Sequence, residues 1–121
     1  MLIVADDRPS LREILTTYLA SEGFVVRAVA DGGQVIELLE SGARPALLIV
    51  DLHMPICDGS EVVSYVRSRP SYAGLPILLL TGHPGVPEDV AANVQAVLLK
   101  PFGLEELAAR VRSLLLHQDA S

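Results

Sequence analysis

The sequence is poor in the residues on which several protein classes depend. It contains one cysteine, Cys57, no tryptophan, and no apolar run near the roughly 18 residues that a membrane-spanning helix needs. A single cysteine excludes an internal disulfide and offers no metal-site spacing, so Cys57 is interpreted as a small hydrophobe at a loop edge. The apolar start, residues 2–5, is shorter than a signal peptide and is followed at once by acid. We therefore expect a cytoplasmic protein that does not contact a membrane.

Positive charge is also scarce. Nine Lys and Arg residues face fifteen Asp and Glu residues, which leaves a net charge of −6, and the basic residues are scattered singly. This pattern argues against direct binding of nucleic acid. Lysine occurs once, at Lys100, whereas arginine occurs eight times. The lysine therefore stands out, because its compact ammonium group differs from the planar fork of arginine.

Apolar periodicity predicts five strands and five helices in strict alternation. The expected strands, rich in branched side chains, cover residues 2–5, 24–30, 46–51, 75–80 and 96–99. The expected helices begin after Pro9, after Asp31, after Gly59, near Glu88 in a short segment that ends by residue 93, and near Leu104. Residues 70–74 are expected to form a turn, and residues 117–121 a frayed end.

This alternation predicts one α/β domain over residues 1–121, with a five-stranded parallel sheet and helices on both faces. We choose the doubly wound flavodoxin-like (CheY-like) strand order 2-1-3-4-5, whose switch point lies between the first and third strands. Ligands bind in such sheets at the carboxyl ends of the strands.

Polar side chains stand at four of these five strand ends, namely Asp6 with Asp7, Asp51, Thr81 and Lys100. Three converging carboxylates repel one another unless a cation lies among them, and Mg²⁺ prefers such oxygen ligands. A hydroxyl and an ammonium suit phosphoryl oxygens, and an aspartate beside them could act as a nucleophile. Taken alone, Asp6 and Asp7 could equally be acids favoured by a helix N-terminus, and Thr81 an ordinary strand residue.

In order and spacing, these motifs resemble the receiver domain of the two-component response-regulator family over essentially the whole chain. The residues that carry the resemblance are Asp6-Asp7, Asp51-Leu52-His53-Met54-Pro55, Asp58-Gly59, Thr81 and Lys100-Pro101-Phe102. The resemblance implies that Asp51 accepts a phosphoryl group from a phosphohistidine on a sensor histidine kinase or a histidine phosphotransfer protein.

The same resemblance implies roles for the other residues. Asp7 and Asp51 would bind Mg²⁺ directly, Asp6 would act mainly through water, and the backbone carbonyl of His53 would be a further ligand. The phosphoryl oxygens would be held by Thr81 and Lys100, and the bond from Lys100 to Pro101 would be cis. Such a domain is a signalling switch that catalyses only its own phosphorylation and dephosphorylation, so we do not expect an enzyme with a separate substrate.

The chain departs from the family pattern on the usual output and dimerisation face. Val97 occupies the position of a switch aromatic, and the segment from Thr81 to Lys100 is short. The phosphorylation chemistry is therefore better supported than its readout. The output partner is undefined: it could be a fused domain of a longer protein, a separate protein, or a second copy in a homodimer.

Two other functions fit parts of the sequence. A pseudo-receiver would keep the fold as an interaction module without taking phosphate. A phosphatase of the haloacid-dehalogenase type would also use an aspartate nucleophile with Mg²⁺, but it needs a second Asp where this chain has His53. Finally, His53 and His83 lie two residues beyond Asp51 and Thr81, where they could tune the lifetime of the phosphorylated state or be simple exposed loop residues.

Overall fold

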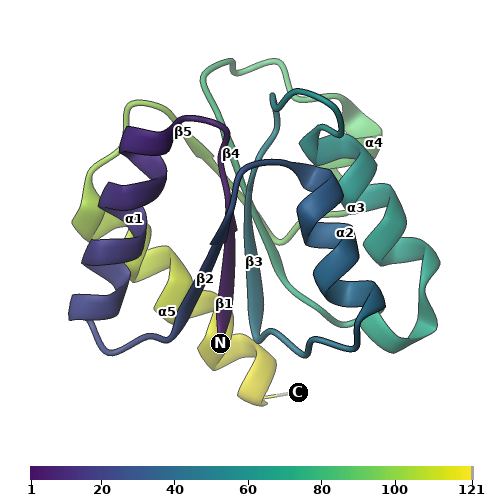
Figure 1. Ribbon diagram of the computed structural model, residues 1–121, viewed down its shortest axis with the longest axis horizontal. Coiled ribbons are helices and arrows are strands. Elements are labelled where there is room, and N and C mark those ends of the chain that lie inside the picture. Colours follow the sequence, from purple (N-terminus) through teal and green to yellow (C-terminus); the bar gives the residue numbers. More distant parts are fainter. Residues whose placement is uncertain (121) are drawn as a thin grey trace.

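The computed structural model describes residues 1–120, with side chains up to residue 116. Five parallel strands form one sheet in the order β2-β1-β3-β4-β5, which confirms the predicted topology (Figure 1). The strands are β1 (Leu2–Ala5), β2 (Val26–Val29), β3 (Leu47–Asp51), β4 (Ile77–Thr81) and β5 (Ala96–Leu99). The helices are α1 (Pro9–Ser21), α2 (Gly32–Glu40), α3 (Gly59–Ser68), the 3₁₀ turn η1 (Pro70–Tyr72), α4 (Glu88–Ala91) and α5 (Leu104–Ala120).

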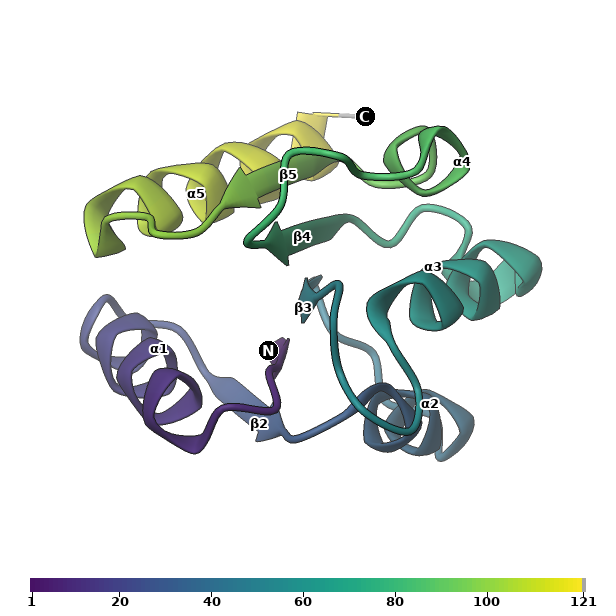
Figure 2. The same cartoon turned by 90° about the horizontal axis from the view of Figure 1, so that it is seen from above.

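Helices cover both faces of the sheet, with α1 and α5 on one side and α2, α3 and α4 on the other (Figures 1 and 2). Successive side chains of a strand point to opposite faces, so the central strands supply two separate cores. Leu47, Ile49 and Leu78 pack with Leu15 of α1 and Leu107 of α5. The alternate residues of the same strands face the other core. There Leu48, Val50 and Leu79 pack with Val35, Val62 and Val66.

Two strands begin two residues later than the sequence predicts, and β3 begins one residue later, at Leu47. β2 begins at Val26 rather than residue 24, because the Phe24 N–H donates to the carbonyl of Leu19 and closes the end of α1. β4 begins at Ile77 rather than residue 75, because the Leu75 N–H donates to Tyr72 in the preceding turn. In both cases the predicted strand was too long, because the residues before the observed strand are apolar. The backbone N–H groups of Phe24 and Leu75 donate within the preceding turn instead of to a neighbouring strand.

The fourth helix is a single turn. It ends at Ala91, although the sequence allowed it to reach residue 93, because Asn93 folds back on it. The Asn93 N–H donates to the carbonyl of Val90, and its side-chain amide donates to the carbonyl of Asp89 at 2.7 Å. Val90 is 6 % exposed and anchors this turn in the core beneath α3.

Arg67 of α3 ties this short segment to the rest of the fold. Its guanidinium donates to acceptors in two separate stretches, the turn before β4 and the lead into β5. These acceptors are the carbonyls of Ala73, Leu75 and Asn93 and the side-chain oxygen of Gln95. The same Gln95 oxygen also accepts from the Ile77 N–H at 2.7 Å. One side chain thus fixes the starts of β4 and β5.

Within the described residues, no helix combines the length and the apolar character required to cross a membrane. The prediction of a frayed end from residue 117 is wrong for the backbone as far as Ala120, where α5 ends, and residue 121 lies outside the described part of the chain.

Replacing Arg67 by alanine is expected to lower the free energy of unfolding by about 2 kcal/mol, because the partly buried carbonyl of Leu75 loses its donor and three further hydrogen bonds are lost. Urea unfolding measures this change, and hydrogen exchange should show the loss of amide protection at residues 93–95. Arg44→Ala, at an exposed arginine, is the matched control and should leave both unchanged. Equal stability of the Arg67 and Arg44 variants would contradict the bracing role.

Candidate functional site

Neighbouring strands bring the acidic residues together at the carboxyl edge of the sheet. β1 pairs with β3 in a register that places Ala5 opposite Val50, so Asp6 and Asp51 leave the sheet side by side. Asp7 follows on the loop to α1. The side chains of Asp6, Asp7 and Asp51 offer carboxylate oxygens that all lie within 4.8 Å of one another. Because α1 and α3 pack on opposite faces, this point is the switch point of the doubly wound sheet.

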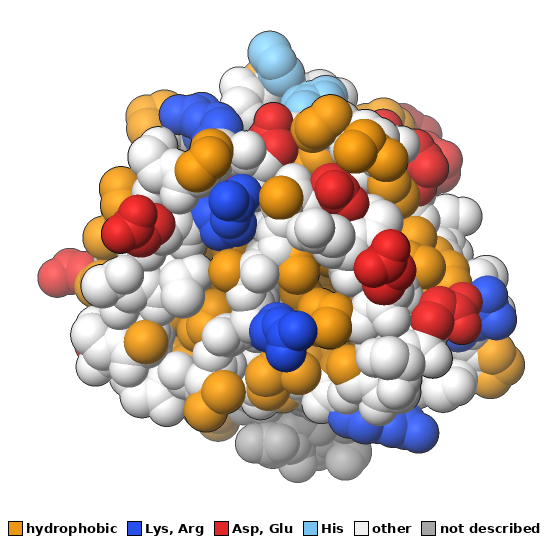
Figure 3. Space-filling view, in the orientation of Figure 1, with side chains coloured by type: hydrophobic (Ala, Val, Ile, Leu, Met, Phe, Trp, Pro, Cys, Tyr) orange, Lys and Arg blue, Asp and Glu red, His pale blue; other side chains and the backbone are white. Residues whose placement is uncertain are grey.

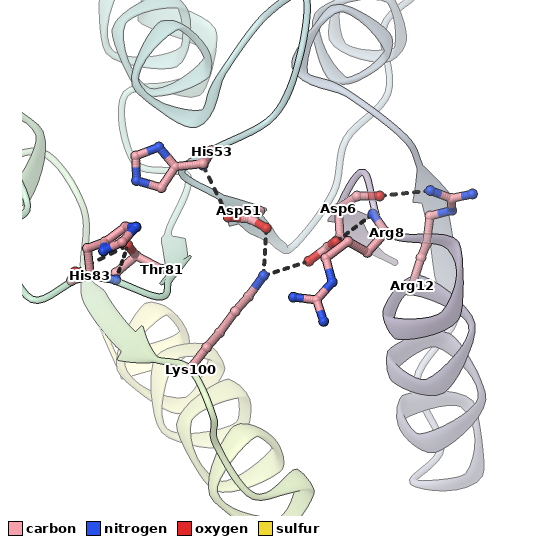
Figure 4. Close-up of polar contacts among 8 residues, drawn as sticks. All are labelled: Asp6, Arg8, Arg12, Asp51, His53, Thr81, His83 and Lys100. Atoms are coloured by element: carbon pink, nitrogen blue, oxygen red, sulfur yellow. Dashed lines mark hydrogen bonds and ion pairs between the residues drawn. The ribbon is translucent and has the colours of Figure 1, made fainter.

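Lys100 reaches this cluster from the end of β5, on the far side of β4. Its Nζ lies 2.6 Å from Oδ2 of Asp51 and 3.3 Å from Oδ2 of Asp6 (Figure 4). The Asp6 and Asp51 side chains are 0 % and 5 % exposed, and that of Lys100 is 16 % exposed. The only lysine of the sequence is therefore the cation that bridges two buried carboxylates, and it precedes a cis bond to Pro101, as expected.

Asp6 is held by the first turn of α1 as well as by Lys100. Its Oδ1 accepts from the Arg8 N–H at 2.9 Å, and its own carbonyl accepts from the Arg12 guanidinium at 2.8 Å (Figure 4). Burial raises the pKa of Asp6 above its ordinary value, because the Arg8 hydrogen bond and the Lys100 charge only partly offset the lost hydration. A neighbouring cation would thus favour the charged form of this carboxyl.

Asp51 presents its second oxygen to the following loop. Oδ1 accepts from the His53 N–H at 3.1 Å, while Oδ2 faces Lys100. Gly59, the first residue of α3, packs directly against this strand end, since a Cβ there would lie 2.6 Å from the Asp51 carbonyl oxygen. The Gly59 N–H also donates to Leu52 and closes the loop. The motif Asp58-Gly59 therefore shapes the surroundings of Asp51.

Asp58 itself caps the amino end of α3. Its carboxylate accepts from the Ser60 hydroxyl at 2.6 Å and from the Glu61 N–H at 3.1 Å. Burial acts to raise the pKa of Asp58, but these hydrogen bonds outweigh it and hold the pKa below its ordinary value. Cys57 beside it is a buried free thiol, as predicted.

Thr81 ends β4 and is fully buried, but its hydroxyl is engaged away from Lys100. It accepts from the His83 N–H at 3.1 Å and lies 3.2 Å from the His83 carbonyl, to which it can donate. The two strand ends do meet through the backbone, where the Lys100 N–H donates to the Thr81 carbonyl at 2.8 Å. Sequence reasoning placed Thr81 at the right strand end, and it had no signal for this hydroxyl contact.

The two loop histidines meet above this edge of the sheet. The rings of His53 and His83 are both exposed and pack edge to face, with centroids 5.4 Å apart (Figure 4). Figure 3 shows histidine side chains standing at one end of the molecule. Two residues that the sequence only placed near the site are thus one aromatic pair that joins the β3–α3 loop to the β4–α4 loop.

Comparison with known proteins decides the family. Residues 2–112 match the model of the response regulator receiver domain. The chain belongs to this family. It is 42 % identical over 117 residues to response regulator MprA of Mycobacterium ulcerans and 41 % identical to MprA of Mycolicibacterium vanbaalenii. These matches cover 94 % of this chain and 49 % of each relative, so this receiver domain spans about half the length of those proteins.

Solved receiver structures superpose closely on this one. A putative response regulator from Chloroflexus aurantiacus matches with a TM-score of 0.85 and 32 % identity, over 95 % of this chain and 96 % of that one. The chemotaxis response regulator CheY4 of Vibrio cholerae matches with a TM-score of 0.83 and 31 % identity, over 93 % and 96 %. The fold agrees with the family, and both identify the chain as a response regulator receiver domain.

Replacing Lys100 by methionine should lower the free energy of unfolding by about 2 kcal/mol in the absence of divalent ions, because Asp6 and Asp51 lose the cation between them. Urea unfolding at neutral pH and low salt measures the difference. Arg110→Met, at an exposed arginine of α5, should leave stability unchanged. An unchanged Lys100→Met protein would show that the two carboxylates do not depend on the lysine.

Proposed function

We propose that this receiver domain accepts a phosphoryl group from a phosphohistidine onto Asp51 in a Mg²⁺-dependent reaction. The observation that carries the proposal is the position of the Asp51 carboxylate. One of its oxygens faces Lys100 and the other the His53 N–H, and the carboxylates of Asp6 and Asp7 lie beside it. The rest of the chain supplies the surroundings that this carboxylate needs.

The transfer forms one bond and breaks one. A carboxylate oxygen of Asp51 attacks phosphorus as the P–N bond of the phosphohistidine breaks, and the electron pair of that bond stays on the imidazole nitrogen, which takes a proton from water. The added charge of about −1.5 to −2 is then placed within reach of the Lys100 ammonium. Lys100 would have to exchange its contact with the Asp51 carboxylate for one with the phosphoryl group.

The acidic cluster fits Mg²⁺. Its three carboxylates are hard oxygen donors within 4.8 Å of one another, and two of them are buried beside a single lysine. When bound there, the ion would neutralise charge on the phosphoryl oxygens. Asp7 and Asp51 would hold it directly, Asp6 through water, and the His53 carbonyl would complete the protein ligands. In support, response regulator TrrA from Thermotoga maritima, 29 % identical with a TM-score of 0.84, has been crystallised with Mg²⁺ and a beryllium fluoride group.

We propose that the Thr81 hydroxyl gives up its hydrogen bonds to the His83 backbone and then binds a phosphoryl oxygen. Its hydroxyl hydrogen bonds with the His83 backbone, so this move would disturb the start of the β4–α4 loop. Val97 stands where receivers usually carry a switch aromatic, and here it packs against the core under α3. The readout would therefore run through the loop rather than through a rotating aromatic ring.

The proposal also covers the phosphoryl donor, the cellular compartment and the output of the domain. The donor is a sensor histidine kinase or a histidine phosphotransfer protein in the cytoplasm. The output is a fused domain, a separate protein partner or a homodimer, and the domain turns over no separate substrate. Since this chain spans about half of its relatives, the unit formed by residues 1–121 is proposed to act as one receiver module.

Incubation with acetyl phosphate and Mg²⁺ should add the mass of one phosphoryl group to the intact protein, because a small donor reaches Asp51 without a protein partner. Intact-mass spectrometry measures the product. Asp51→Asn and a sample with chelator should stay unmodified.

Other outcomes would favour the alternatives. A wild-type chain that gains no phosphoryl group from acetyl phosphate or from any kinase would indicate a pseudo-receiver. Steady turnover of a small phosphate ester would indicate a phosphatase instead.

The histidine pair is expected to set the lifetime of the phosphorylated state. Its rings contact each other on the two loops that follow Asp51 and Thr81, so His53→Ala and His83→Ala should change the rate of dephosphorylation severalfold while phosphorylation is retained. The decay of phosphorylated protein, followed by intact mass, measures this rate. Unchanged decay in both variants would leave the pair as ordinary loop residues.

A further inference from the structure

Ile56, in the loop between β3 and α3, has an unfavourable backbone conformation. Its φ is +69°, and it is the only residue other than glycine with a positive φ among those that the structure describes. The Cys57 N–H donates to the Pro55 carbonyl at 2.7 Å, which makes Ile56 the centre of a γ-turn. This form of the turn is rare and strained, and a branched Cβ makes it worse. A glycine or an asparagine would adopt it more easily.

Packing does not explain the isoleucine, because its side chain is 88 % exposed. It is the most exposed of the large hydrophobic side chains in the described residues. Pro55 before it is exposed as well, whereas Met54 and Cys57, which flank this exposed pair, are each 8 % exposed. A strained residue that buries nothing within its own chain stabilises nothing there, so its use lies in contact with another molecule.

The loop places Ile56 close to the phosphoacceptor. It lies three positions before Gly59, so its Cα is within about 11 Å of that residue, which packs on the Asp51 backbone. A protein donor must bring its phosphohistidine to the buried Asp51 carboxylate. An interface of standard size covers about 800 Å² of each partner, a disc with a radius of about 16 Å. A donor centred on Asp51 would therefore cover Ile56.

We propose that Ile56 is a docking residue for the protein that donates the phosphoryl group, which buries this side chain when it reaches Asp51. The inference rests on the proposed function, and it adds a specific contact that a small donor such as acetyl phosphate cannot use. A few side chains that become fully buried in an interface carry most of its affinity. The strained turn is the means by which the loop holds the isoleucine away from its own core.

The test compares two donors in three variants. Ile56→Asn removes the apolar contact and tolerates the positive φ, whereas Ile56→Leu keeps an apolar side chain. Val25→Asn is the matched control, because Val25 is 71 % exposed but precedes β2 at the opposite end of the sheet. The protein donor is the autophosphorylated sensor kinase, from a panel encoded in the source genome, that phosphorylates the wild-type chain fastest.

Transfer from the kinase to Ile56→Asn should fall roughly tenfold, while Ile56→Leu and Val25→Asn stay near the wild-type rate. Phosphorylation by acetyl phosphate should be the same in all four proteins. The melting temperature of Ile56→Asn should equal or exceed that of the wild type, because the strain is relieved; a purely structural isoleucine would lower it.

Three results would overturn the proposal: a wild-type rate of kinase transfer to Ile56→Asn, an equal loss with both donors, or the absence of any protein donor while acetyl phosphate works. Failure of acetyl phosphate with the wild-type chain would instead remove the proposed function itself.

Discussion

The contact between Lys100 and the buried carboxylates is the constraint on which the rest of the site depends. Asp6 and Asp51 leave neighbouring strands with almost no access to water, and like charges at this range repel strongly. The lysine that separates them comes from residue 100, so the cluster exists only when β1, β3 and β5 are in register within one sheet. The complete site therefore requires these strands to be in place in the folded sheet.

A buried ion pair is weak evidence of stability, because desolvation offsets much of the attraction between its charges. The stability of this domain comes instead from the two apolar cores on either face of the sheet. The polar groups of the site are concentrated at the carboxyl edge of the sheet. This separation lets the edge carry unfavourable features, such as the raised pKa of Asp6 and the strained turn at Ile56, without loss of the fold.

Most of the fold and the membership of the acidic cluster could be predicted from the sequence, because both depend on patterns that are local in the chain. Buried strands are continuous apolar runs, and the polar residue after each run marks a strand end. Contacts made by single backbone groups could not be predicted in this way. The donors of Phe24 and Leu75, and the hydroxyl of Thr81, take partners that no residue pattern indicates. The positive φ of Ile56 contradicts its residue type, so only the structure could reveal it.

The contacts around the fourth helix divide the segment between β4 and β5 into two parts. Its second part is held firmly, because Arg67 binds the Asn93 carbonyl and the Gln95 side chain, and Val90 is buried in the core. Its first part, residues 82–87, is largely exposed. This part follows Thr81, whose hydroxyl accepts a hydrogen bond from the His83 N–H. A shift of Thr81 toward Asp51 would release the His83 backbone and act first on this loop. Val97 is partly buried and packs against the core, and Arg67 braces the lead into β5, so the surface that changes would be the loop that carries His83 rather than the whole face formed by α4 and β5.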